Sequence, residues 1–191
     1  MFVSAVDYVR RAWKGETNPV LATWILMTVV IGLSFWMYWN SPKFSWTGNI
    51  GLIAALFNIM IILTGVIATN LKNGTTGVAF NGVQLLCLVL GGVVFVFWLL
   101  TDQPLTAYVL VQCIALIAYA ATVKRLWNSE RSTEPQFLWT SVLLASLCAL
   151  YPAWVKHELF AWIYLARAIP STAVVIYLIA RIKRQMVKVY A

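Results

Sequence analysis

Long apolar stretches alternate with short polar segments along almost the whole chain. A helix needs about 20 apolar residues to cross the hydrocarbon core of a bilayer. Six stretches meet this requirement, at Val20–Trp39, Gly48–Ala68, Val78–Leu100, Thr106–Val123, Gln136–Trp154 and Leu159–Ile182. The pattern therefore predicts an all-α, polytopic membrane helical bundle with six spans, in which residues 1–191 form a single domain.

Composition supports a membrane protein and limits the partners. Of the 191 residues, 62% are hydrophobic and 10% are charged, whereas soluble domains have about 45–50% apolar and about 25% charged residues. The net charge of +8 lies in residues that flank the apolar stretches, so we expect contact with anionic headgroups and no nucleic-acid binding. The lipid bilayer is the expected partner, and self-association is left open.

The basic residues also predict an orientation. Most lie on one side of the predicted spans, at Arg10, Arg11, Lys14, Lys72, Lys124, Arg125, Arg131, Arg181, Lys183, Arg184 and Lys188. The other side has Lys43 and Lys156. Loops rich in Lys and Arg stay in the cytoplasm, so we expect a protein of the cell (inner) membrane with both termini cytoplasmic.

One motif occurs twice. "RRAWKGETNP" ends at Pro19 and "KRLWNSERSTEP" ends at Pro135, and each has two basic residues, a spacer and a tryptophan before a polar loop. Beyond the prolines, Trp24 lies near the position of Trp139. Membrane helices often have basic and aromatic ends, so coincidence is the alternative, but the ordered series of matches favours a duplication.

A duplication would divide the chain into two parallel three-helix units. The units are residues 1–68 and 106–182, and residues 78–100 form a linker helix between them. The opening helix of the first unit is truncated, because fewer than 20 residues precede Pro19. A single linker gives both units the same orientation, and transporters built from such repeats bind solutes at the repeat interface.

This three–one–three layout resembles the SWEET and PQ-loop (MtN3-like) superfamily of membrane transporters. "YAATVKRLWNSERS" looks like the cytoplasmic exit of a family first helix, and "LWTSVLLASLCALYPAW" looks like the second helix. "WNSERSTEPQFLWTS" is also similar to the lipid-A-disaccharide synthase N-terminal domain. The resemblance implies a SWEET-like small-solute carrier that works by facilitative alternating access.

Arg167 is the basic residue that falls inside a predicted span, and Pro170 follows it. A charge in a membrane helix usually faces the bundle interior or a cavity, so Arg167 is a candidate contact for an anionic or polar solute. Pro170 is expected to kink the helix, because proline removes a backbone hydrogen bond. Alternatively, Arg167 extends to the outer face near Asp102 or Glu158.

Neutral polar residues supply further candidates for substrate binding. Asn81 and Gln84 are three residues apart and share a helical face. The resemblance points to Asn58, because family pockets often use an asparagine in the third helix of a unit. Trp162 is the aromatic candidate. The alternatives are that amides such as these and Gln112 link helix to helix, and that Trp162 anchors the chain at the membrane interface.

The sequence contains no arrangement typical of an enzyme. It has no metal-ligand spacing, no activated nucleophile, no phosphate-binding loop and no cofactor motif. Its carboxylates all lie in predicted loops or termini, which favours a passive carrier over a proton-coupled one. We therefore expect a carrier for a polar or anionic metabolite. The alternative is a non-transport accessory or lipid-associated interaction protein that keeps the fold.

Overall fold

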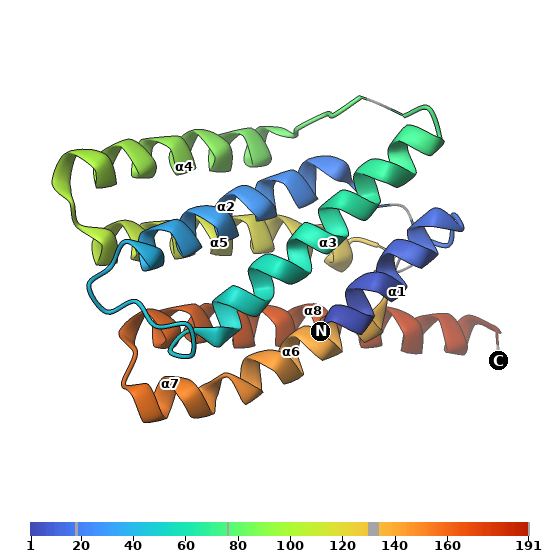
Figure 1. The fold of residues 1–191 in the computed structure, drawn as a ribbon. Helices are drawn as coiled ribbons and strands as arrows, with labels where there is room; N and C mark the ends of the chain where they lie inside the picture. Colours follow the sequence, from blue (N-terminus) through green and yellow to red (C-terminus); the bar gives the residue numbers. More distant parts are fainter. Residues whose placement is uncertain (18, 76, 130–133, 191) are drawn as a thin grey trace.

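The computed structural model describes residues 1–17, 19–75, 77–129 and 134–190, and the regular structure in these ranges is helical (Figure 1). The helices are α1 (Phe2–Trp13), α2 (Leu21–Trp39), α3 (Ile50–Lys72), α4 (Gly82–Thr101), α5 (Pro104–Trp127), α6 (Gln136–Cys148), α7 (Leu150–Lys156) and α8 (Leu159–Tyr190). Six candidate membrane spans result in the described part of the chain, namely α2, α3, α4, α5, α6 with α7, and α8. The prediction of an all-helical chain with six helices long and apolar enough to span a membrane is confirmed for the described residues.

Two of the observed helices differ from the predicted spans in where they begin or break. We expected Asn81 inside the third span, but α4 begins after it, at Gly82, because Asn81 and Gln84 form a capping box. The Asn81 side chain accepts from the Gln84 N–H at 2.8 Å, and the Gln84 side chain accepts from the Asn81 N–H at 3.0 Å. The fifth span is divided at Ala149, where Pro152 has no N–H to offer the carbonyl of Cys148.

The contacts between helices centre on α3 and α8. Helix α3 packs against α1 and α2, and α8 packs against α5 and α6. The two groups meet where α2 packs on α5, α1 on α6 and α3 on α8. Helix α4 lies at the edge of the bundle, along α2 and α5 (Figure 1). The interior between the two groups is where a cavity can form.

Helix α1 has 12 residues, which is about 18 Å and too short to cross a bilayer. It is held on α3 by close packing: a Cβ atom at Gly65 would lie 2.3 Å from Cγ2 of Val9. It is held on α2 by Trp24, whose Nε1 donates to the Tyr8 hydroxyl at 3.2 Å, with the ring centroids 5.2 Å apart. These contacts position α1 beside the bundle interior.

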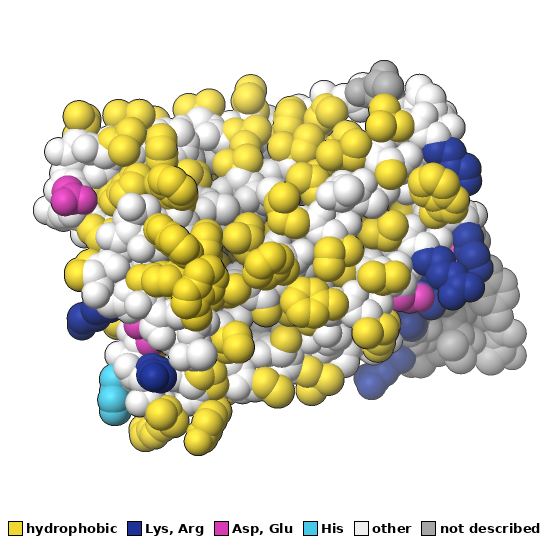
Figure 2. All heavy atoms as spheres, viewed as in Figure 1, with side chains coloured by type: hydrophobic (Ala, Val, Ile, Leu, Met, Phe, Trp, Pro, Cys, Tyr) yellow, Lys and Arg dark blue, Asp and Glu magenta, His cyan; other side chains and the backbone are white. Residues whose placement is uncertain are grey.

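Charge is distributed unevenly between the two ends of the bundle. Arg10 and Arg11 lie in the last turn of α1, Lys72 in that of α3, and Lys124 and Arg125 in that of α5. Figure 2 shows Lys and Arg gathered at this end, here called the basic end, with apolar side chains covering most of the visible face between the ends. The other end is called the opposite end.

Candidate functional site

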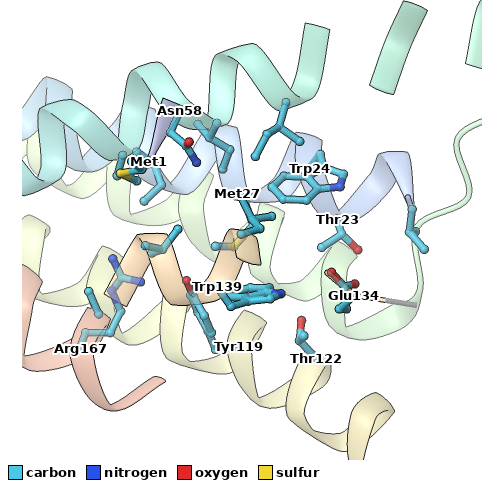
Figure 3. A pocket seen from close by; sticks show the side chains of 18 of the residues that line it. Met1, Thr23, Trp24, Met27, Asn58, Tyr119, Thr122, Glu134, Trp139 and Arg167 are labelled. Atoms are coloured by element: carbon cyan, nitrogen blue, oxygen red, sulfur yellow. The ribbon is translucent and has the colours of Figure 1, made fainter. Parts of the chain in front are cut away.

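A cavity of about 890 Å³, its open mouth included, lies between the two groups of helices. Side chains of α2, α3, α5, α6 and α8 form its walls, together with Met1 and Glu134 (Figure 3). Most of the lining side chains are apolar. Glu134 lies at one end of the cavity, here called the mouth, and Asn58 and Arg167 lie at the other, the deep end. Arg125, in the last turn of α5 at the basic end, pairs with Glu134.

Arg167 is buried at the deep end, with 5% of its surface exposed. Its Nε donates to Oε1 of Gln112 on α5 at 2.7 Å, and Nε2 of Gln112 donates to the Ser34 hydroxyl on α2 at 2.8 Å. The guanidinium carbon lies 5.1 Å from the ring centroid of Tyr164 and 5.6 Å from that of Tyr119. Three helices therefore hold this cation in place inside the bundle.

The interaction of Arg167 with Gln112 decides between the two predicted placements of the arginine. Arg167 does not extend to the outer face, and no ion pair links it to Asp102, Glu158 or another carboxylate in the described ranges. The alternative that it reaches the outer face is therefore wrong. Its two Nη nitrogens have no hydrogen-bond partner among the described residues and are available to the cavity.

Asn58 is the other polar side chain at the deep end. It is 5% exposed, and its Oδ1 is buried without a hydrogen-bond partner among the described residues. In Figure 3, Asn58 and Arg167 project into the cavity from opposite sides. Counting from Ile50 and from Leu159, each is the ninth residue of its helix, α3 and α8 respectively.

Two tryptophans form the flat walls between the mouth and the deep end (Figure 3). Trp24 is the fourth residue of α2, and Trp139 is the fourth residue of α6. The ring of Trp139 meets that of Tyr119 edge-on at 6.1 Å, and its buried Nε1 has no partner among the described residues. Trp24, Trp139, Asn58 and Arg167 thus line one cavity.

The mouth is bordered by one ion pair and one interhelical hydrogen bond. Nη2 of Arg125, at the end of α5, lies 2.5 Å from Oε1 of Glu134, just before α6. Nε2 of Gln84 donates to the hydroxyl of Thr23 at 3.0 Å. Asn81 and Gln84 line a second cavity of about 850 Å³, its open mouth included, which shares Thr23 and Arg125 with the first. Asn81 and Gln84 therefore lie near the mouth of the first cavity and not beside Arg167.

The opposite end of the bundle is closed by aromatic packing. The ring of Phe160 lies 5.4 Å from that of Tyr38 and 4.9 Å from that of Tyr108, and Nδ2 of Asn49 donates to the Tyr108 hydroxyl at 3.4 Å. Gly51 permits the close approach, since a Cβ atom there would lie 3.0 Å from Cβ of Ala149. Of the two ends of the bundle, the cavity therefore opens only toward the basic end.

One acidic side chain lies within this closed end. Glu158, between α7 and α8, is 5% exposed, and its Oε1 accepts from the Phe160 N–H at 3.4 Å. Loss of hydration on burial raises the pKa of the Glu158 carboxyl, although the Phe160 N–H and the charge of Lys43 oppose the shift. Protonation of Glu158 therefore favours the packed arrangement.

Two predicted site residues lie away from the cavity. Trp162 is 36% exposed and meets the ring of Trp154 edge-on at 6.3 Å, as expected for an interface anchor. Pro170 is exposed, and α8 continues through it. Of the residues that line the cavity, Asn58 and Arg167 were predicted contacts, whereas Trp139, Tyr119, Glu134 and Met27 are among those that were not. The repeated motif was the available signal for Trp139, through its match with Trp24.

No group of three or more His, Cys, Asp or Glu side chains suited to a metal ion occurs in the part of the chain that the structure describes. No family model, curated protein or solved structure matches the chain. The resemblance to the SWEET and PQ-loop superfamily therefore remains a hypothesis, and Glu130 and Arg131 of the repeated motif lie outside the described residues.

Proposed function

We propose that the protein is a small-solute membrane carrier of SWEET-like type, which moves a polar or anionic metabolite by facilitative alternating access. The observation that carries the proposal is the cavity between the two groups of helices, with the buried Arg167 and Asn58 at its deep end. A buried cation in a membrane helix is unfavourable by at least a few kcal/mol and usually marks a solute or ion path. Here it lines the cavity between the two groups of helices.

The internal repeat supports the same proposal. In each proposed unit the third helix packs against the first and the second, as α3 does with α1 and α2, and α8 with α5 and α6. The cross-contacts also correspond, because α1 packs on α6 and α2 packs on α5. The cavity is lined by Trp24 and Trp139, which follow the two copies of the repeated motif at comparable positions. A solute site at the interface of two repeats is a common plan for carriers.

In this proposal the structure represents the inward-facing state. The basic end is cytoplasmic by the positive-inside rule, and the mouth beside Arg125 and Glu134 opens there. The aromatic packing of Tyr38, Tyr108 and Phe160 forms the outer gate. Outward opening would separate these rings while the α2 and α6 ends close over the mouth. Both termini would then lie in the cytoplasm of a cell (inner) membrane.

Uptake into proteoliposomes tests the carrier proposal. The purified chain is reconstituted and offered radiolabelled sugars, nucleosides and small organic anions, with empty liposomes as the background. We expect saturable, uncoupled uptake of at least one solute, and its loss in Arg167→Gln protein that elutes as a single folded species. If the folded, reconstituted chain moves none of these solutes, the proposal is wrong.

A non-transport, lipid-associated accessory role is the second candidate. The predominantly apolar wall of the cavity favours it, because such a wall also suits the apolar part of an amphiphile. Under this alternative the reconstituted protein binds a ligand or a lipid but leaves it on the side where it was added. Binding and uptake measured on the same preparation therefore separate the two functions.

A further inference from the structure

Arg167, at the deep end of the cavity, is a buried cation without a carboxylate partner among the described residues. In the part of the chain that the structure describes, the charged side chains that line the cavity are Arg125, Glu134 and Arg167. Arg125 and Glu134 form an ion pair at the mouth, and Arg167 has no carboxylate partner in the described ranges. A charge held out of water is unfavourable unless an opposite charge or several hydrogen bonds compensate it. The deep end thus lacks one negative charge.

The guanidinium of Arg167 is oriented for a planar anion. Oε1 of Gln112 accepts a hydrogen bond from Nε at 2.7 Å and fixes the plane, and the rings of Tyr164 and Tyr119 lie beside it. The two Nη nitrogens remain on the cavity side. A fixed guanidinium binds a carboxylate through parallel N–H···O bonds, which are stronger than neutral hydrogen bonds.

The walls next to this cation favour a flat, apolar body. Trp24 and Trp139 face the space between the mouth and Arg167, with Met27 between them (Figure 3). Aromatic side chains bind rings by offset stacking or edge contacts, and methionine adapts to irregular apolar shapes. A neutral sugar would leave the charge of Arg167 uncompensated.

We propose that the cavity binds an organic monoanion, a single carboxylate on a small aromatic body, with the carboxylate on the Nη nitrogens of Arg167 and the ring packed against Trp24, Met27 and Trp139. A phosphate monoester has close to two negative charges at neutral pH, which is more than the single charge of Arg167 compensates. This inference deepens the proposed function and rests on it for the role of the cavity, but binding is measured without transport.

Three probes with the same ring and different charge test the inference on the full-length protein in detergent. They are benzoate with one negative charge, benzamide with none, and phenyl phosphate with nearly two, titrated calorimetrically at pH 7.5. We expect benzoate to bind, and benzamide and phenyl phosphate to bind at least about tenfold more weakly, because the charge-assisted bonds are lost or one charge is left uncompensated.

A charge-neutralising variant separates the charge of Arg167 from the shape of the cavity. Gln112 does not line the cavity, and Gln112→Glu places a carboxylate where Oε1 now lies 2.7 Å from the Arg167 Nε. Arg167 then has an internal partner, and benzoate affinity should fall by at least about tenfold. Gln103→Glu is the matched control, because Gln103 is exposed and lies between α4 and α5 at the opposite end.

Each outcome supports or overturns the inference. Loss of benzoate binding in Gln112→Glu, with wild-type affinity in Gln103→Glu, supports it. Equal binding of benzoate and benzamide, wild-type affinity in Gln112→Glu, or no benzoate binding by the folded protein overturns it. If Gln112→Glu does not fold, Arg167→Lys keeps the charge but not the parallel bonds, so it should bind benzoate more weakly than wild type and more tightly than Arg167→Gln; equal affinities in these two variants overturn the inference.

The same measurements distinguish this inference from the proposed function. Benzoate binding without uptake into proteoliposomes would reject the carrier and leave the monoanion site standing. Uptake of a neutral solute that benzoate does not inhibit would support a carrier and reject the monoanion site.

Discussion

The contact between α1 and α3 gives the most quantitative prediction. A Cβ atom at Gly65 would lie 2.3 and 2.4 Å from the two γ-carbons of Val9 and 2.9 Å from its Cβ. Carbon atoms in contact prefer about 3.5–4.0 Å, so Gly65→Ala requires α1 to move by roughly 1 Å. Valine cannot avoid the clash easily, because its χ1 has one strongly preferred rotamer in a helix.

Overpacking of this kind destabilises by about 1–3 kcal/mol. For a protein of this length each kcal/mol corresponds to about 2–4 °C, so the thermal midpoint of Gly65→Ala should fall by about 2–12 °C. Thermal unfolding in detergent, followed by tryptophan fluorescence, measures the shift. Gly92→Ala is the matched control, because Gly92 also lies within a helix but a Cβ atom there would meet no neighbouring side chain within 4 Å.

Removing the opposing atoms should restore most of the stability. Val9→Ala deletes both γ-carbons and leaves one contact of 2.9 Å, so Gly65→Ala with Val9→Ala should be more stable than the sum of the single variants implies. A coupling of about 0.5–3 kcal/mol is typical of residues in contact. The reasoning fails if Gly65→Ala unfolds at the wild-type temperature, or if the two substitutions are additive.

Three further predictions follow from single contacts. Burial raises the pKa of the Glu158 carboxyl above its ordinary 4.5, so the contribution of Glu158 to stability is complete below pH 4.5 and is lost as the pH rises through the raised pKa. From pH 4 to pH 8, the thermal midpoint of Glu158→Gln should therefore rise relative to that of the wild type. A constant difference between the two midpoints contradicts this. Asn81→Ala should lose about 0.5–2 kcal/mol through the α4 cap, whereas Asn81→Ser keeps an acceptor and most of the stability, as guanidinium unfolding would show. Asp7→Asn breaks an exposed ion pair with Arg11, and its thermal midpoint should change by less than about 4 °C, corresponding to at most about 1 kcal/mol.

The sequence alone was sufficient for the helices and for one decisive residue. Six apolar stretches of bilayer length predicted the six spans, because hydropathy is a property of consecutive residues. Arg167 was recognisable because a charge within an apolar stretch is unfavourable wherever the helix packs. The motif before Pro19 and Pro135 also indicated that Trp24 and Trp139 are comparable positions, and both line the cavity.

What the tertiary structure decided is which side chains meet. A helix that is apolar on every side has no periodicity to show which face turns inward, so neither the pairing of Arg167 with Gln112, 55 residues away, nor the meeting of Asn58 and Trp139 at one cavity could be deduced. Asn81 looked like a span residue because an N-cap is distinguished by backbone conformation and not by its own hydropathy. Composition along the chain determines that these helices are long and apolar enough to cross a membrane, and packing between distant helices determines which side chains line their interior.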